Sequence, residues 1–293
     1  MSLFFTQLMT GIQNGAIYAS LAIALVLVYK TTGVLNFAQG EMALFSTYIV
    51  WKFTTWDMPV WIAIVLAMVI SFIGGALIER VVIRPVERSA PLVIVIVTIG
   101  LFLALNSLTQ LAFGNQTKVL PSAYPQHTWR PGSIQISSNT LVLVGMLAVE
   151  CALLYLLLQR TKLGLAFRGV ASNPDSSRLL GVPVGRILMV GWGLAAAVGC
   201  LAGALVIPTT AGLVPASMQA ILVFAFAAAA LGGFDSVVGA VVGGMIVGIA
   251  DSLTTGYVDA LHGLNLLVPF GLILVVLLFR PAGLFGTTRV ERV

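Results

Sequence analysis

Residue types that could carry out catalysis or hold a metal are scarce in this sequence and do not cluster. The two histidines, His127 and His262, belong to no group of metal-ligating side chains, and neither cysteine, Cys151 or Cys200, has metal-ligand spacing. No Ser/His/Asp or Cys/His arrangement stands out as a nucleophilic centre. Because no glycine is followed by lysine, the phosphate-binding Gly-x-x-x-x-Gly-Lys-Ser/Thr loop does not occur. We therefore predict no catalytic residue, metal, cofactor or disulfide in this chain, and no ATP hydrolysis by it.

Polar side chains within long apolar stretches are the remaining candidates for a site. Glu41 follows Asn36 and Gln39 within two helical turns, and uncharged amides recur in other apolar stretches. The candidates for a path taken by a small polar solute are Asn14, Asn36, Gln39, Glu41, Asn106 and Gln219. Hydrogen bonds between helices would explain the amides as simply. The acids Glu41, Glu150 and Asp251 could lie at headgroup level or make local packing bonds, and no buried proton relay is predicted.

The elements that position these side chains must cross a membrane. Hydrophobic residues make up 59% of the 293 residues and charged residues 9%, whereas a soluble domain is about a quarter charged. The mean hydropathy is +1.06. Charge-free windows long enough for one or two crossings run between Asp57 and Glu79, Arg88 and Lys118, Arg186 and Asp235, and Asp259 and Arg280. A soluble globular protein and a disordered chain are both excluded, and the sequence predicts an all-α polytopic membrane protein.

About nine transmembrane helices, with a range of eight to ten, fit the hydropathy pattern. The predicted spans cover residues 8–29, 37–56, 58–79, 92–113, 140–159, 187–208, 217–232, 237–255 and 263–279. Alternation across the membrane then puts the N-terminus outside and the C-terminus in the cytoplasm. Twelve of the 15 Lys and Arg residues fall in inner segments, as the positive-inside rule requires, so the formal charge of +5 gives no reason to expect a nucleic-acid partner. The second span, or the closely spaced seventh and eighth, could instead be a broken or re-entrant helix.

Two polar connections are longer than the others. Residues 114–139 form the predicted extracytoplasmic loop, in which prolines disfavour a helix and the run at 133–138 fits a short strand. Residues 160–186 form the predicted cytoplasmic loop, with five basic residues and one acid. Its apolar residues are spaced as in amphipathic helices, with Gly181 and Pro183 as a stop. Such a loop either lies on anionic headgroups or docks a cytoplasmic partner.

Glycine is frequent, with 30 residues in 293, and recurs at helical spacing in the predicted spans. The spacing is clearest for Gly239, Gly243, Gly244 and Gly248. Small residues four positions apart let two helices approach closely in lipid. We predict a helix-packing role for these four glycines, within the bundle or against a second subunit.

Four motifs are spread over nearly the whole chain. They comprise Gly15–Ala19 with Gly33–Glu41, Thr161–Gly164 with Arg168, Asn173 and Leu180–Val182, Gly232–Ser236 with Gly239–Ala240 and Gly243–Gly244, and Arg280–Gly286. Together they resemble the branched-chain amino acid ABC transporter permease family of the LivH type. The Asn-Phe-Ala-x-Gly-Glu run at 36–41 is specific to that family, whereas Gly169 and Ser177 replace alanines that are usual in it.

The resemblance implies a single transmembrane permease domain over residues 1–293 with the ABC importer permease fold. Such a permease translocates branched-chain or related hydrophobic amino acids across the bacterial inner membrane. Its implied partners are a second related permease, two ATP-binding cassette subunits that bind ATP and Mg, and an extracytoplasmic solute-binding protein. The residues that would couple the inner loop to the ATPases are Gly164, Arg168, Asn173, Arg178, Leu180 and Gly181.

Other functions stay open at this point. The same family includes importers of urea, short amides and aromatic acids. A stand-alone secondary transporter or channel would work without ATPase partners. An integral-membrane structural or assembly subunit would show no dependence on solute at all.

Overall fold

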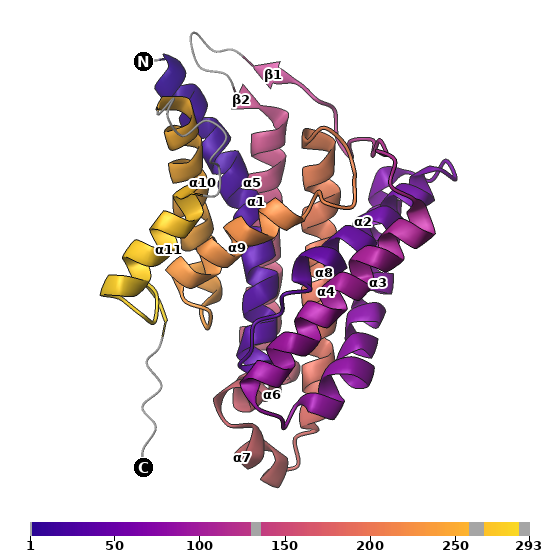
Figure 1. The fold of residues 1–293 in the computed structure, drawn as a ribbon, viewed down its shortest axis with the longest axis vertical. Helices are drawn as coiled ribbons and strands as arrows, with labels where there is room; N and C mark the ends of the chain where they lie inside the picture. The colour runs from indigo at the N-terminus through magenta and orange to yellow at the C-terminus, as the bar shows by residue number, and fades with distance from the viewer. Residues whose placement is uncertain (1, 130–135, 258–266, 287–293) are drawn as a thin grey trace. The chain divides into compact units, whose positions relative to one another are not determined.

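The computed structural model describes residues 2–129, 136–257 and 267–286, and within them the chain is mainly helical (Figure 1). The helices are α1 (Ser2–Thr32), α2 (Gln39–Thr54), α3 (Val60–Ile78), α4 (Pro91–Phe113), α5 (Ser138–Arg160), α6 (Lys162–Ser172), α7 (Pro174–Leu179), α8 (Val184–Val206), α9 (Gln219–Gly232), α10 (Val237–Tyr257) and α11 (Leu267–Phe279). Strands β1 (Thr128–Trp129) and β2 (Ile136–Ser137) pair antiparallel, so a short strand does form within the run expected to contain one. Residues 133–135 of that run, His262 and the start of the ninth predicted span lie outside the described residues.

Six helices among the described residues are long and apolar enough to cross a membrane. They are α1, α3 continued to Val86, α4, α5, α8 continued to Thr209, and α10. Helices α9 and α11 are apolar but only 14 and 13 residues long. The prediction of an α-helical membrane protein is confirmed, while the number of crossings stays a prediction.

Internal contacts divide the chain into two compact units. The first unit comprises residues 1–26, 125–147 and 220–293, and the second comprises residues 27–124 and 148–219. Helices α1 and α5 each contribute to both units. Each unit is therefore assembled from segments far apart in the sequence rather than from one contiguous stretch.

In the first unit, α10 packs against α1 through glycines that let the two backbones touch. A Cβ atom added at Gly248 would overlap the backbone of Gly15, and one added at Gly244 would lie 2.6 Å from the Cα of Ala19. Gly11 on α1 is equally confined, since its Cβ would lie 2.7 Å from the Cα of Ile249. Backbone contact of this kind is how small residues stabilise helix pairs when lipid surrounds them.

Helix α10 uses its other glycines against α9. A Cβ atom at Gly243 would overlap the carbonyl of Ala228, and one at Gly239 would overlap the carbonyl of Gly232. Of the four glycines predicted for packing, 239 and 243 therefore meet α9, whereas 244 and 248 meet α1. Consecutive glycines in one helix thus serve two different neighbours within the first unit.

We expect Gly248→Val to destabilise the protein, because the added side chain would overlap the α1 backbone. Overpacking of this kind costs about 1–3 kcal/mol and should lower the thermal unfolding midpoint of the purified protein in detergent. Gly145→Val on α5 is the matched control, since a Cβ atom there would meet nothing within 4 Å. Equal midpoints for the two variants would contradict this packing.

In the second unit, α8 is the buried centre and packs against α3 and α2. A Cβ atom at Gly75 of α3 would lie 2.5 Å from the carbonyl oxygen of Trp192, and one at Gly193 would lie 2.8 Å from that of Phe72. Glycines on both helices therefore permit a close crossing. The indole of Trp192 is fully buried at this contact.

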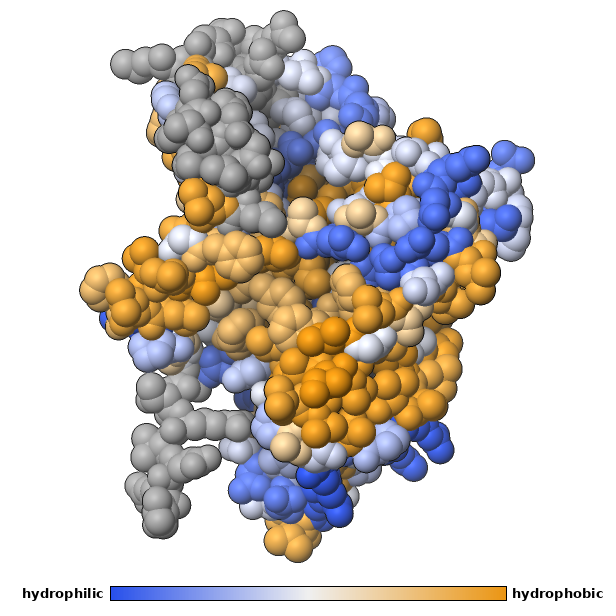
Figure 2. Space-filling model, viewed as in Figure 1, coloured by the Kyte–Doolittle hydropathy of each residue, from blue (hydrophilic) through white to orange (hydrophobic). Residues whose placement is uncertain are grey.

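Helices α3 and α4 carry an apolar surface of the second unit. Figure 2 shows it as an orange area over these helices, next to blue residues at α6 and α7. Its exposed side chains include Ile62, Val65, Val69, Ile73, Leu77, Leu92, Ile96, Ile99, Leu103 and Leu111. A continuous apolar face of this extent is suited to contact with lipid rather than water.

Helix α2 is a partial span that begins at the level of the middle of α8. The Gln39 amide at its first turn reaches the carbonyl of Ala195, the central residue of α8, and Thr47 lies against Gly203 further along the same helix. Its 16 residues fall short of the ~20 needed to cross the hydrocarbon core. That the second predicted span, residues 37–56, is a broken or re-entrant helix stays a prediction, as does the number of crossings.

Candidate functional site

The connection before α2 is held in place by the side chains of Asn36 and Gln39. Asn36 Oδ1 accepts from the Ala38 backbone N–H at 3.0 Å, and its amide group donates to Gln39 Oε1 at 3.2 Å. Gln39 Nε2 in turn donates to the carbonyl of Ala195 at 2.9 Å. Both side chains are fully buried, so these two candidate pathway residues satisfy the irregular backbone and fasten it to α8.

Two turns of different helices bring Glu41 and Asn106 together. Asn106 Nδ2 donates to Glu41 Oε2 at 3.0 Å and to the carbonyl of Pro215 at 2.9 Å. Gln110, one turn further along α4, donates to Asn106 Oδ1 at 2.6 Å. Gln219 is a further polar side chain beside the Glu41 carboxyl group. We call these four side chains, Glu41, Asn106, Gln110 and Gln219, the Glu41 cluster.

The Glu41 carboxyl group is only half satisfied within this cluster. Glu41 is only 1% exposed, yet its Oε1 has no hydrogen-bond partner in the described part of the chain. Asn106 donates to the other oxygen, Oε2. A buried acceptor without a partner is costly, so such an atom in a stable fold calls for an explanation.

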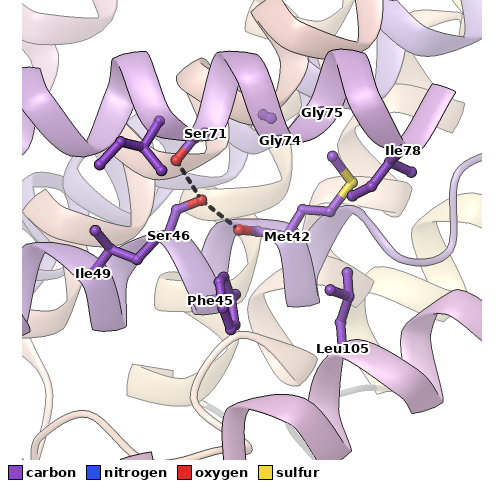
Figure 3. A pocket seen from close by; sticks show the side chains of 11 residues that line it. Met42, Phe45, Ser46, Ile49, Ser71, Gly74, Gly75, Ile78 and Leu105 are labelled. Carbon is purple, nitrogen blue, oxygen red and sulfur yellow. Dashed lines mark hydrogen bonds between the residues drawn. The ribbon is translucent and has the colours of Figure 1, made fainter. Parts of the chain in front are cut away.

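An apolar pocket of about 100 Å³ is lined by residues that are sequence neighbours of this cluster on α2 and α4 (Figure 3). Its lining is Met42, Phe45, Ser46, Ile49, Ile70, Ser71, Gly74, Gly75, Ile78, Leu105 and Ala196. Ser71 donates to Ser46 Oγ at 2.7 Å, and Ser46 donates to the carbonyl of Met42 at 2.7 Å. Because its two hydroxyl groups already have partners, the pocket presents a mainly apolar wall.

Five of the six candidate pathway residues thus gather around α2 in the second unit. Asn14 does not join them, since it belongs to α1 of the first unit, where it is half-buried. Sequence reasoning counted Gln110 among the uncharged polar side chains of the apolar stretches but did not select it as a pathway residue, and it missed the pocket altogether. The four-residue spacing from Asn106 to Gln110 was the available signal for the first.

Asp251 forms a buried packing bond rather than a solvated headgroup contact. In the first unit, the Tyr18 hydroxyl donates to Asp251 Oδ2 at 3.2 Å, and the Tyr18 ring stacks on Phe224 with centroids 4.5 Å apart. Glu150 on α5 is also buried. For Asp251, the structure therefore selects the packing bond from the two alternatives that the sequence left open.

The loop over residues 160–186, named the inner loop for its predicted side of the membrane, folds into α6 and α7. Thr161 caps α6 by accepting from the Gly164 N–H at 3.0 Å, and Asn173 caps α7 by accepting from the Ser176 N–H at 2.9 Å. A Cβ atom at Gly164 would overlap the carbonyl groups of Leu157 and Leu158, so this loop glycine is fixed against the end of α5.

The end of α7 is defined by a glycine in the left-handed conformation. Gly181 has φ +81°, which is the usual geometry directly after a helix C-cap. The two residues before it, Leu179 and Leu180, are 90% and 84% exposed. The tip of α7 therefore presents two leucines outward. Arg168 on α6 donates to Gln159 Oε1 at 2.8 Å.

Ion pairs tie the inner loop to the segment that joins α3 and α4. Arg178 pairs with Asp175 at 2.8 Å and with Glu87 at 2.8 Å. Since Glu87 lies on the α3–α4 connection, Arg178 links α7 to a part of the chain 91 residues away. Sequence reasoning selected Arg178 but gave no sign of Glu87 as its partner.

A second charged link at the same connection was missed entirely. Glu79 is fully buried and begins a π-helix, Glu79–Ile83, that continues α3. Arg84 pairs with Glu79 at 2.7 Å and donates to the carbonyl of Gly185, at the start of α8, at 2.6 Å. The five-residue separation of Glu79 and Arg84 suits a π-turn rather than an α-turn, which hides the pair from helical-spacing arguments.

A charge-poor helical chain with apolar outer faces, buried amides and one structured inner loop defines an integral membrane protein of the permease class. The family model for the permease component of branched-chain amino acid transport systems matches residues 7–277. The chain belongs to this family, as its motifs predicted.

Curated relatives match over almost their whole length. The high-affinity branched-chain amino acid transport system permease protein LivH of Escherichia coli K12 is 32% identical over 310 residues, covering 99% of this chain and 98% of the relative. The LivH protein of Salmonella typhimurium is 31% identical over 311 residues with the same coverage. A probable LivH protein of Methanocaldococcus jannaschii is 30% identical over 297 residues, covering 94% and 91%. No solved structure matches the chain at a significant level.

We expect Asn106→Ala to destabilise the protein, because it leaves the Glu41 carboxyl group and the Pro215 carbonyl without their shared donor. Loss of hydrogen bonds to a buried charged group costs about 1–3 kcal/mol, which should lower the thermal unfolding midpoint in detergent. Ser107→Ala, at the exposed next residue of α4, is the control. An unchanged midpoint for Asn106→Ala would show that the amide contributes nothing to the cluster.

Proposed function

We propose that this chain is the membrane-spanning permease subunit of an ATP-driven importer of branched-chain or related hydrophobic amino acids. The observation that carries the proposal is the family match over residues 7–277, together with full-length relatives named for branched-chain amino acid transport. Importers of urea, short amides or aromatic acids, and a stand-alone secondary transporter, are not favoured by these relatives.

In this proposal the chain lies in the inner membrane of a bacterial cell and crosses it about nine times. The N-terminus is outside and the C-terminus in the cytoplasm, because twelve of the 15 Lys and Arg residues then fall on the inner side. The arrangement puts α6 and α7 in the cytoplasm. The loop over residues 114–139 lies on the outer side, where a solute-binding protein would dock.

The partners that complete the importer are a second related permease, two ATP-binding cassette subunits and a solute-binding protein. Since this sequence has no phosphate-binding loop, ATP and Mg would be held by the partner ATPases. Their closure on ATP would favour one conformation of the permease over the other through contacts that differ between the two states. Transport against a gradient then needs no charged relay within this chain.

The inner loop is the element that would transmit this motion. The exposed leucines at the tip of α7, Leu179 and Leu180, offer an apolar contact for an ATPase surface. Arg178 connects α7 to Glu87 on the α3–α4 connection, and Arg84 on that connection bonds to Gly185 of α8. A displacement of α7 would therefore reach α3, α4 and α8 together.

Purification in mild detergent followed by identification of the bound chains tests the assembly. Recovery of two ATPases and a second permease supports the importer, whereas a lone homo-oligomer contradicts it. Uptake into proteoliposomes then tests the substrate. Leucine, isoleucine or valine uptake that requires ATP and the solute-binding protein supports the proposal, and uptake of urea alone contradicts it.

We expect Arg178→Glu to uncouple ATP hydrolysis from uptake while the complex still assembles. The new carboxylate would repel both Asp175 and Glu87, so α7 would lose its link to the α3–α4 connection. Amino acid uptake per ATP hydrolysed should fall several-fold in proteoliposomes.

A charge exchange provides the control for this variant. Arg178→Glu combined with Glu87→Arg restores an ion pair at the same place and should recover part of the uptake. Asn173→Pro should act like Arg178→Glu, since it removes the α7 cap and cannot adopt the Asn173 φ of −151°. Normal uptake by both Arg178→Glu and Asn173→Pro would refute the coupling role of the loop.

A further inference from the structure

The second unit combines a buried carboxylate oxygen of Glu41 that lacks a hydrogen-bond partner with an apolar pocket whose lining includes neighbours of Glu41 on α2 but not Glu41 itself. We propose that these form the substrate-recognition site of the permease, in which Glu41 binds the α-ammonium group of the amino acid and the pocket receives its aliphatic side chain. The inference rests on the function proposed above and adds where and by what chemistry the substrate is recognised.

Two features of the fold beside Glu41 favour its ionised form, which accepts hydrogen bonds and does not donate them. It lies in the first turn of α2, where the helix dipole favours a negative charge, and Asn106 donates a charge-assisted hydrogen bond to Oε2. No cation among the described residues pairs with it, because the acids in ion pairs there are Glu79, Glu87 and Asp175. Oε1 accepts a hydrogen bond from no described residue, although Gln219 lies near the carboxyl group, so Oε1 can accept from a ligand.

An ammonium group is the ligand chemistry that fits this oxygen. Ionisable side chains within membranes are costly and mark substrate or ion paths when they lack a partner in the protein. Transporters often place such sites where a discontinuous helix begins near the midplane. Helix α2 begins in this way beside the middle of α8, and it carries an acid in its first turn, which selects a cation rather than an anion.

The pocket follows Glu41 along the same helix. Phe45 lies four positions after Glu41, hence one turn further on the same face, and Leu105 directly precedes Asn106 on α4. The pocket has a volume of about 100 Å³. The hydroxyl groups of Ser46 and Ser71 already have hydrogen-bond partners, so a ligand in the pocket does not need to supply a polar group to them.

Gly74 keeps the pocket open without serving any helix contact. A Cβ atom at Gly74 would meet nothing within 4 Å, whereas one at the neighbouring Gly75 would collide with the Trp192 carbonyl. Figure 3 shows both glycines on α3 at the pocket, with Ser71 one turn before Gly75. Close packing on α8 therefore explains Gly75, and the space needed by a ligand explains Gly74.

The combination distinguishes between the candidate substrates. A carboxylate beside an apolar wall suits a molecule with an ammonium group and a branched aliphatic side chain. Urea and short amides carry neither a cation nor an alkyl group large enough to fill the pocket. The site thereby favours aliphatic amino acids within the proposed function.

The ammonium contact is tested by Glu41→Gln in the complete complex, reconstituted in proteoliposomes with its ATPases and solute-binding protein. Leucine uptake should fall about tenfold, the usual effect of losing a hydrogen bond to a charged group, while binding-protein-stimulated ATP hydrolysis continues. Glu41→Asp should keep part of the uptake because it keeps the charge. Glu150→Gln, the same change at another buried carboxyl group, is the matched control and should leave uptake unchanged.

The pocket is tested by Gly74→Val, which fills it without disturbing a helix contact. Uptake of leucine should fall about tenfold more than uptake of alanine, because the loss of room affects the larger side chain. Gly100→Val on α4 is the matched control, since its Cβ would also meet nothing within 4 Å but Gly100 does not line the pocket. The leucine-to-alanine ratio should stay unchanged in that variant.

The possible outcomes separate the two proposals. If the wild-type complex shows no ATP-dependent uptake of aliphatic amino acids, the proposed function fails and this site fails with it. If the wild type transports leucine and Glu41→Gln does so equally well, the function stands and the ammonium site is overturned. Loss of assembly or of ATP hydrolysis in both Glu41 variants would assign Glu41 a structural role and overturn the site as well. If Gly74→Val lowers leucine and alanine uptake equally, the pocket does not receive the substrate side chain, and that part of the proposed site is overturned.

Discussion

The scarcity of hydrogen-bond partners in hydrocarbon is the constraint on which this structure depends. Backbone groups inside a membrane must be satisfied by the protein, so the chain is helical wherever it is apolar. The one irregular stretch before α2 is tolerated because the side chains of Asn36 and Gln39 take up its polar groups and bind it to α8. A partial helix can thus begin near the middle of α8, and its first turn can carry a buried acid.

Helix packing follows from the same surroundings. Since lipid is as apolar as a leucine side chain, hydrophobicity does not draw helices together, and close contact must do so. In the first unit this contact runs through the glycines of α10, and in the second through Gly75 and Gly193 between α3 and α8. Gly74, Gly100 and Gly145 have no such contact, so glycine content alone does not reveal which residues hold helices together.

The charged groups divide between two tasks. Those near α6 and α7 form a chain of ion pairs and hydrogen bonds, Asp175 to Arg178 to Glu87 and Glu79 to Arg84 to Gly185, which joins the inner loop to three long helices. The partly exposed Arg178 pairs add little stability, about 0–1 kcal/mol. Glu79 is fully buried, and Arg84 and Arg178 both link segments far apart in the sequence. Glu41 lies apart from these contacts, and its Oε1 has no hydrogen-bond partner among the described residues.

The amino-acid sequence alone established the membrane class, the positions of most long helices, the amphipathic inner loop with Gly181 as its stop, and the family, because hydropathy, charge and local motifs are properties of contiguous residues. It also named Glu41, Asn106 and Gln219 as polar groups of interest. Only the tertiary structure decided that these three meet, that α2 is a partial span, that Arg178 pairs with Glu87, and that Gly74 borders a pocket while Gly75 supports α8. These facts depend on how α2, α3, α4 and α8 cross. The crossing brings together groups that lie from 65 to 156 positions apart in the sequence, so no local spacing encodes their contacts.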